Sequence, residues 1–196
     1  DSLARTPAER AALVARGAHL VATRGCADCH GATLGGATVV DDPMIGRLAG
    51  PNLTAGGRGR ALDDRAWELA LRHGVRPDGT PLRVMPSTDY VAMTDEDVAA
   101  IVAYARSLAP DTTPRASLRV GPLMRALQVA GKVDVVSARA IAAAGPGGVQ
   151  RTTHLAAIAP AATPAYGAYL AATCTGCHQA DFTGGPIAGA PPDWPA

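Results

Sequence analysis

The chain has 196 residues, which suggests one or two domains, and 47% of them are hydrophobic, enough to support a core. The net charge is +1 and there is no basic block, so nothing indicates binding to nucleic acid. No stretch approaches the roughly 20 apolar residues that span a bilayer, so we expect no membrane span in this chain.

The first helix is predicted to begin at 6–9, where Thr6-Pro7-Ala8-Glu9 forms a capping box with proline at the first helical position. Apolar and small residues then share one face at helical spacing: Leu13, Gly17, Leu20 and Val21. Gly17 would let a second helix approach closely. We expect the partner to be a helix over 95–108.

Two further helices are predicted before residue 110. One covers about 64–73, with Asp63 or Asp64 as its cap. The other runs from Asp95 to Leu108 and ends before Pro110. Its apolar stripe consists of Val98, Ile101, Val102, Ala105 and Leu108.

Two C-x-x-C-H motifs use every cysteine in the chain: Cys26-Ala27-Asp28-Cys29-His30 and Cys174-Thr175-Gly176-Cys177-His178. This pattern is typical of covalently attached c-type haem. One helical turn places two thiols to form thioethers with the two vinyl groups of one porphyrin, and it sets the histidine beneath the iron. We therefore predict two haem c groups, with His30 and His178 as iron ligands. The porphyrins would also supply the aromatic bulk that a chain with a single phenylalanine lacks.

Other uses of these cysteines agree less well with the sequence. A disulfide framework would not require a histidine after each second cysteine, and a zinc site built from two C-x-x-C pairs would leave both histidines unexplained. A thioredoxin-like redox pair is preceded by a strand, whereas the residues before Cys26 and Cys174 are predicted to be helical.

Over residues 6–108 the chain resembles the two-haem class I c-type cytochromes, which include subunits that carry electrons for membrane-bound dehydrogenases. The matching features occur in the family's order: Gly17 and Leu20, the motif C-x-x-C-H-G, Gly50-Pro51-Asn52-Leu53, Met85-Pro86, and the acidic run Thr94-Asp95-Glu96-Asp97. The resemblance implies a mainly α fold of tandem class I domains, in which the two terminal helices of a domain cross over its haem.

The resemblance also implies roles around the first haem. Met85 would be the sixth iron ligand, although the residues alone leave Met44 and Met93 as competitors. The carbonyl of Pro51 would accept a hydrogen bond from the ring of His30.

A few other polar residues are weaker candidates. The candidates for contact with the haem propionates are Trp67, Arg58 and Arg60. Surface or packing positions, rather than iron ligation, are expected for His19, His73 and His154.

A compressed second copy begins at Thr163-Pro164, which repeats Thr6-Pro7. From threonine to first cysteine there are 11 residues instead of 20, and Phe182-Thr183-Gly184-Gly185 echoes Thr33-Leu34-Gly35-Gly36. After His178 the sequence has no G-P-N-L, no Met-Pro pair and no closing helix. We expect the second domain to be truncated here; the alternatives are a second haem capped by an unusual ligand such as His154, or one with an open sixth position.

These observations divide the chain into a first haem domain over 1–108, a linker over 109–162, and the start of a second haem domain over 163–196. Within the linker, Leu123–Val129 and Ala138–Ala144 are predicted to be short helices. Loop signals occur at 110–114 and 145–148.

Two functions follow from this interpretation. The first is an electron-transfer cytochrome of a respiratory chain, which relays single electrons between a dehydrogenase or quinol-oxidising complex and an acceptor. The second is a haem enzyme that uses an open second iron on a small oxidant or sulfur compound. By family resemblance we expect redox protein partners, and a location in the periplasm or on the outer face of a bacterial membrane.

Overall fold

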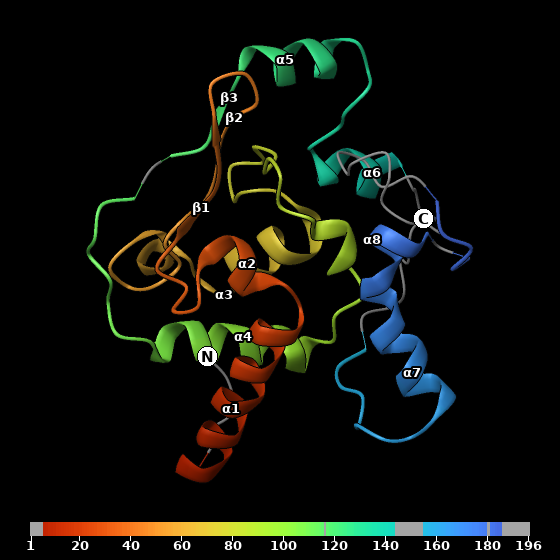
Figure 1. Cartoon of the computed structure of the whole chain (residues 1–196). Coiled ribbons are helices and arrows are strands. Elements are labelled where there is room, and N and C mark those ends of the chain that lie inside the picture. The colour runs from red at the N-terminus through yellow and green to blue at the C-terminus, as the bar shows by residue number, and fades with distance from the viewer. Residues whose placement is uncertain (1–5, 116, 144–154, 180, 186–196) are drawn as a thin grey trace. The chain divides into compact units, whose positions relative to one another are not determined.

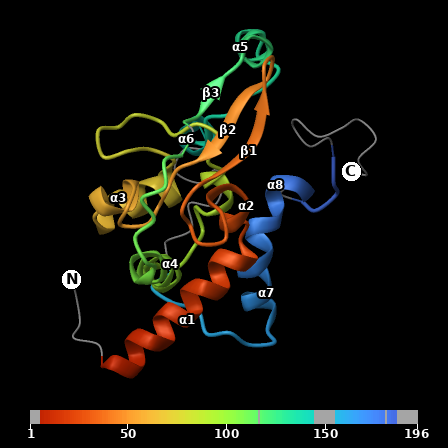
Figure 2. The same ribbon diagram turned by 60° about the vertical axis from the view of Figure 1, so that its left-hand side comes forward.

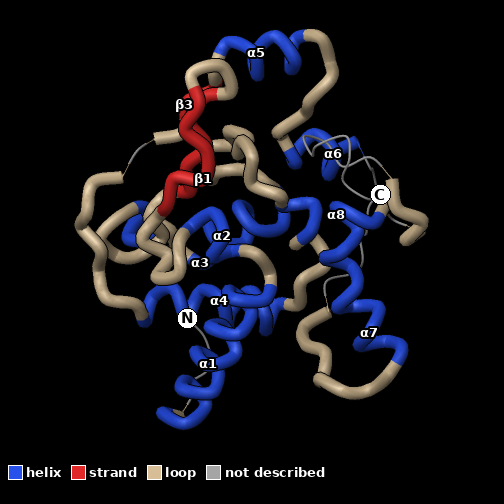
Figure 3. The backbone as a smooth tube through the Cα atoms, viewed as in Figure 1, coloured by secondary structure: helices blue, strands red, loops and turns tan. Residues whose placement is uncertain are grey.

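The computed structural model describes residues 6–115, 117–143, 155–179 and 181–185 (Figure 1). Helices dominate these residues, and the strands form one small sheet (Figure 3). The chain divides into two compact units that are each discontinuous in sequence. One comprises Asp1–Trp67 and Glu96–Leu127, and the other Glu68–Asp95 and Gln128–Ala196.

The long helix of the first unit is α1 (Pro7–Thr23). Its N-terminus has the predicted capping box, since the Thr6 hydroxyl accepts from the Glu9 amide and the Glu9 carboxylate accepts from the Thr6 amide. These two bonds satisfy amides that a helix start leaves without intrahelical partners.

Helix α1 packs against α4 (Asp95–Ser107), which belongs to the first unit except for its first residue (Figure 2). A Cβ at Gly17 would overlap the carbonyl of Ala100 and the Cβ of Tyr104, so glycine permits this close approach. The buried residues come from both helices: Leu20, Val21, Val98, Ile101, Val102 and Ala105. The predicted contact between the first and last helices of the domain is confirmed.

The first unit also contains a sheet that the sequence analysis did not predict. Strands β1 (Ala37–Asp42), β2 (Gly46–Gly50) and β3 (Arg119–Val120) are antiparallel in the order β1-β2-β3. The Asp42 carboxylate accepts from the amides of Met44 and Ile45 and so closes the turn between the first two strands. The β-branched run at 38–40 and the following Asp-Asp-Pro were the available signals.

The predicted helix over 64–73 is confirmed in two parts. It begins as α3 (Asp64–Glu68), capped by Asp63, whose carboxylate accepts from the Ala66 amide at 2.7 Å. It continues as a π-helical turn, η2 (Leu69–His73), and ends at Gly74 with a φ of 64°. The boundary between the two units falls within α3, after Trp67.

The second unit is built from short elements. In chain order they are η2, the 3₁₀ turn η3 (Ser87–Asp89), α6 (Ser137–Ala143), α7 (Pro164–Ala171), the 3₁₀ turn η4 (Ala172–Cys174) and α8 (Thr175–His178). Turn η3 contacts α6, η4 and α8. Helix α5 (Pro122–Val129) spans the boundary between the units. Both short helices predicted in the linker are therefore confirmed.

None of the helices in the described part of the chain is long and apolar enough to cross a membrane.

Candidate haem-attachment site

The first C-x-x-C-H motif forms its own short helix, α2 (Cys26–His30), directly after α1. The chain turns between the two helices at Gly25, whose φ is 73°. Cys26 and Cys29 lie one turn apart with half-buried side chains and free thiols. Helix α2 contacts α1, β1 and β2, so its orientation is fixed on several sides.

The environment of these thiols disfavours redox or nucleophilic chemistry. Burial raises the pKa of Cys26 to about 11 and also raises the pKa of Cys29. Reactive cysteines and redox pairs have lowered pKa values, because the thiolate is the nucleophile.

Among the described residues there is also no group of three or more His, Cys, Asp or Glu side chains that is arranged to hold a metal.

His30 is buried, with 7% of its surface exposed, and its Nδ1 lies 2.9 Å from the carbonyl oxygen of Pro51. Because a carbonyl can only accept, Nδ1 carries the proton and Nε2 keeps its lone pair. Burial lowers the pKa of His30, and the bond to Pro51 partly offsets this shift. A neutral imidazole with its proton on Nδ1 is the form that ligates a metal through Nε2.

The loop that carries Pro51 is held against the loop that follows α2. The Leu53 amide donates to the Leu34 carbonyl at 2.8 Å, and the Gly36 amide donates to the His30 carbonyl at 2.8 Å. On the other side, a Cβ at Gly50 would overlap the Cys29 carbonyl. Backbone contacts therefore surround the His30–Pro51 bond.

Trp67 provides a test of whether these residues fit a haem. The side chain is 3% exposed, and its Nε1 is buried without a hydrogen-bond partner among the described residues. Leaving such a donor unpaired costs about 1–3 kcal/mol. A haem propionate is an acceptor of the kind this donor lacks, so the first unit fits the group.

The other propionate candidates, and the described histidines that were not expected to ligate iron, are exposed or half-buried. Arg58 and Arg60 are exposed, as is His19, whereas His73 is half-buried. His154 lies outside the described residues.

Met85 belongs to the second unit and is half-buried. It follows Val84, whose φ is 70°, and its carbonyl accepts from the Ser137 hydroxyl at 2.7 Å. Of its competitors, Met44 is 53% exposed at the hairpin turn and Met93 is 2% exposed. The role of Met85 as sixth ligand stays a prediction.

The backbone after the second motif repeats the backbone after the first. The first, fourth and sixth residues after each motif histidine have positive φ: 78°, 54° and 88° at Gly31, Leu34 and Gly36, and 64°, 58° and 77° at Gln179, Phe182 and Gly184. In both copies the sixth amide donates to the histidine carbonyl, at 2.8 Å and 3.1 Å. Leucine and phenylalanine rarely adopt positive φ, so the recurrence indicates a common local structure. Phe182 takes the place of Leu34 in it, and not that of Thr33 as the sequence comparison had aligned it.

The two motifs differ in the exposure of their side chains. His178 is exposed, Cys174 is exposed and Phe182 is 53% exposed, whereas His30 and Leu34 are buried.

Residues 14–109 match the family model for cytochrome c. They form a mainly helical cytochrome c domain, and such a domain implies covalently bound haem c. The matched range contains α2 with its motif, the Pro51 loop and α4.

The curated relatives are cytochrome subunits of dehydrogenases. The chain is 35% identical over 111 residues to the cytochrome c subunit of alcohol dehydrogenase (quinone) from Gluconacetobacter polyoxogenes, a match that covers 53% of this chain and 23% of the relative. It is 36% identical over 100 residues to the fructose dehydrogenase cytochrome subunit of Gluconobacter japonicus, covering 46% and 20%. The matches thus span less than a quarter of these relatives.

Sequence reasoning missed a set of bonded polar residues, of which two lie in the Pro51 loop and two lie beside it: Asn52 and Thr54, and Asp111 and Arg115. These residues are joined by hydrogen bonds. Asn52 and Asp111, for example, are bonded although they are 59 residues apart in the sequence. Asn52 belongs to the G-P-N-L motif and Asp111 to a stretch predicted only as a loop, so no local pattern indicated that they pair.

Proposed function

We propose that the chain is an electron-transfer cytochrome that carries two haem c groups. It relays single electrons between a dehydrogenase or quinol-oxidising complex and an acceptor. The observation that carries the proposal is the buried His30, whose Nδ1 donates to the Pro51 carbonyl and which ends the short helix α2 that begins with Cys26 and contains Cys29. The cytochrome c match over 14–109 supports it.

Each residue of the first site has a separate task. Cys26 and Cys29 would attach haem c as thioethers, and His30 and Met85 would ligate its iron. Bound there, haem c supplies one-electron iron chemistry. A methionine thioether favours the reduced metal and raises the potential, and two protein ligands leave no position for a substrate.

The second site rests on Cys174, Cys177 and His178. The support is the repeated motif and the repeated backbone that follows it. In this proposal the chain contains a first haem domain over 1–108, a linker over 109–162 and the start of a second haem domain over 163–196.

The proposed location rests on the resemblance to the class I c-type cytochromes, and the proposed partner is supported by the names of the relatives. These are cytochrome subunits of alcohol, fructose and gluconate 2-dehydrogenases. We propose that this chain likewise serves an oxidoreductase complex in a respiratory chain, in the periplasm or on the outer face of a bacterial membrane.

The test is the intact mass of the protein purified from its own cell, combined with the pyridine haemochrome spectrum. Two haems per chain are expected. The double variant C174S/C177S, expressed with the haem-attachment machinery, should retain one, and C26S/C29S should retain the other. A wild-type chain with one haem would contradict the two-centre relay, and a chain with none would contradict the cytochrome function itself.

A further inference from the structure

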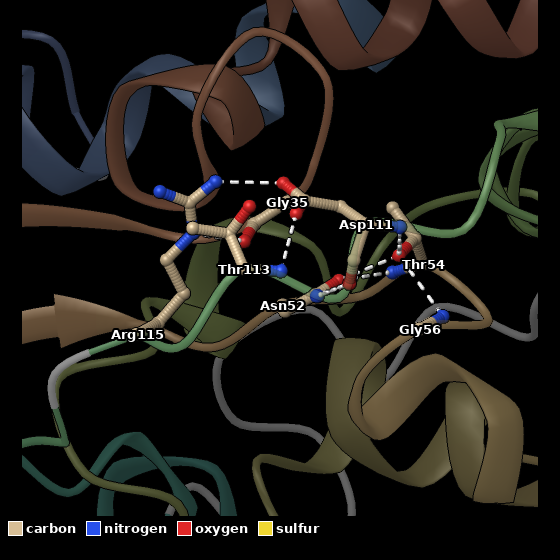
Figure 4. Close-up of polar contacts among 7 residues, drawn as sticks. All are labelled: Gly35, Asn52, Thr54, Gly56, Asp111, Thr113 and Arg115. Carbon is tan, nitrogen blue, oxygen red and sulfur yellow. Dashed lines mark hydrogen bonds and ion pairs between the residues drawn. The ribbon is translucent and has the colours of Figure 1, made fainter.

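The segment that follows α4 runs beside both loops that surround His30. One loop follows α2 and includes Gly35, and the other follows β2 and includes Asn52 and Thr54. Figure 4 shows Asp111 and Arg115 bonded to residues of both loops. We call Asp111, Thr113 and Arg115 the clasp; every residue in these contacts belongs to the first unit.

The main chain of Asp111 holds the Pro51 loop. Its carbonyl accepts from the Asn52 side-chain amide, and its own amide donates to the Thr54 hydroxyl at 3.0 Å. The Asn52 side-chain oxygen accepts from the amide and the hydroxyl of Thr54, at 2.9 and 2.7 Å. Asn52 directly follows Pro51, so these bonds fix the residue next to the carbonyl that His30 uses.

The side chains of the clasp hold the segment itself in place. Arg115 donates from Nε to the Gly35 carbonyl at 2.9 Å and from its terminal nitrogen to the Asp111 carboxylate at 2.6 Å. The Asp111 carboxylate also accepts from the Thr113 amide at 2.8 Å. A Cβ at Gly35 would overlap the Asp111 carboxylate, so a glycine is needed there for the approach.

We infer that Asp111 and Arg115 are positioning residues for the axial histidine: by holding the 51–56 loop against α2 they keep the Pro51 carbonyl in hydrogen-bond contact with His30 Nδ1. Pro51 is fixed from both sides, since Gly50 packs on the Cys29 carbonyl and Asn52 is bonded to the clasp. The inference rests on the proposed haem function. Under it, the clasp helps to set the reduction potential of the haem at Cys26 and Cys29.

The sign of the effect separates positioning from charge. A hydrogen bond from Nδ1 to a carbonyl makes imidazole a stronger donor to the metal, which favours the oxidised iron and lowers the potential. Loosening that bond therefore raises the potential. Loss of the positive charge of Arg115 acts in the opposite direction. Removing a positive charge stabilises the more positive, oxidised iron and so lowers the potential.

The experiment compares Arg115→Ala, Arg115→Lys and Arg47→Ala in the full haem-bearing chain by spectroelectrochemical titration, with C174S/C177S identifying the signal of the first haem. Arg47 is the matched control: its side chain is 34% exposed and pairs with Asp41, as the 38% exposed Arg115 pairs with Asp111. The control removes the same charge, and Arg47 bonds to neither loop. Arg115→Lys keeps the charge but lacks the fork that reaches both acceptors.

We expect the potential to rise in Arg115→Ala by up to about 59 mV, which is a tenfold change in a one-electron equilibrium. It should rise by less in Arg115→Lys and stay level or fall in Arg47→Ala. Exchange of the His30 Nδ1 proton, followed by NMR in the reduced protein, should become roughly tenfold faster in Arg115→Ala, the scale of one lost charge-assisted hydrogen bond. It should become faster by less in Arg115→Lys and stay unchanged in Arg47→Ala.

A potential that falls or stays level in both Arg115 variants, with unchanged proton exchange, would overturn the inference. If Arg115→Ala does not fold, Arg115→Lys decides the question alone, because its charge is that of the wild type. A wild-type chain without haem at Cys26 and Cys29 would instead contradict the proposed function, so the two failures are distinguishable.

Discussion

Gly17 and Gly167 lie in α1 and α7, the helices that precede the two C-x-x-C-H motifs, yet the structure predicts opposite effects of replacing them with alanine. In α1, a Cβ at Gly17 would overlap the carbonyl carbon and oxygen of Ala100 and the Cβ of Tyr104. In α7, a Cβ at Gly167 would have no described atom within 4 Å. The same substitution in two helix interiors therefore differs only in what the new methyl group meets.

The magnitudes follow from two opposing terms. Glycine to alanine in a helix interior stabilises by about 1 kcal/mol, and this term applies to both sites. At Gly17 the atoms in the way are mainly backbone, which cannot rotate aside, so α1 and α4 must separate; overpacking of this kind costs about 1–3 kcal/mol and occasionally more. We expect Gly17→Ala to destabilise by up to about 2 kcal/mol, and Gly167→Ala to stabilise by about 0.5–1 kcal/mol.

The assay is guanidinium unfolding of the haem-bearing chain, followed by far-ultraviolet circular dichroism. The midpoint should fall for Gly17→Ala and rise or stay level for Gly167→Ala, with unchanged slopes. Equal midpoint shifts of the same sign would refute the reasoning, because they would mean that helix propensity alone governs both positions and that α1 does not rest on α4 at Gly17.

Three further predictions concern single contacts. Replacing Thr6 with alanine removes the hydroxyl that caps α1 and should cost about 1 kcal/mol in the same unfolding experiment. Trp67→Phe should stabilise the haem-free chain, because it deletes a buried N–H without a partner, and should lose that advantage once haem is attached; equal effects in both forms would argue against a propionate contact. Finally, hydrogen bonds from Thr113 and Arg115 lower the pKa of Asp111 to about 2, below its value of about 4 in an unfolded chain. Its contribution to stability is therefore present above pH 4 and lost as the pH falls towards 2, and an acid titration of Asp111→Asn should lack this component.

Local signals in the sequence were sufficient for most helices. The capping box at Thr6 and Glu9, the Asp63 cap and the apolar stripe of α4 each predicted an element that the structure contains. Such signals lie within a few residues of one another, so no knowledge of the fold is needed to read them. The sheet was missed because its strands are short and its third strand has only two residues, far along the chain.

The sequence by itself also determined the chemistry of attachment, since each C-x-x-C-H motif holds both thioether cysteines and the axial histidine within five consecutive residues. The family resemblance anticipated the bond between His30 and Pro51, but only the tertiary structure decided which distant residues hold the Pro51 loop in place. Pro51 lies 21 residues from His30, and Arg115 lies 80 residues from Gly35. Likewise, the sequence predicted a close helix approach at Gly17, but only the fold shows that Gly167 has open space around it. Contacts of this kind depend on how separate elements pack, and no local pattern of residue types encodes that packing.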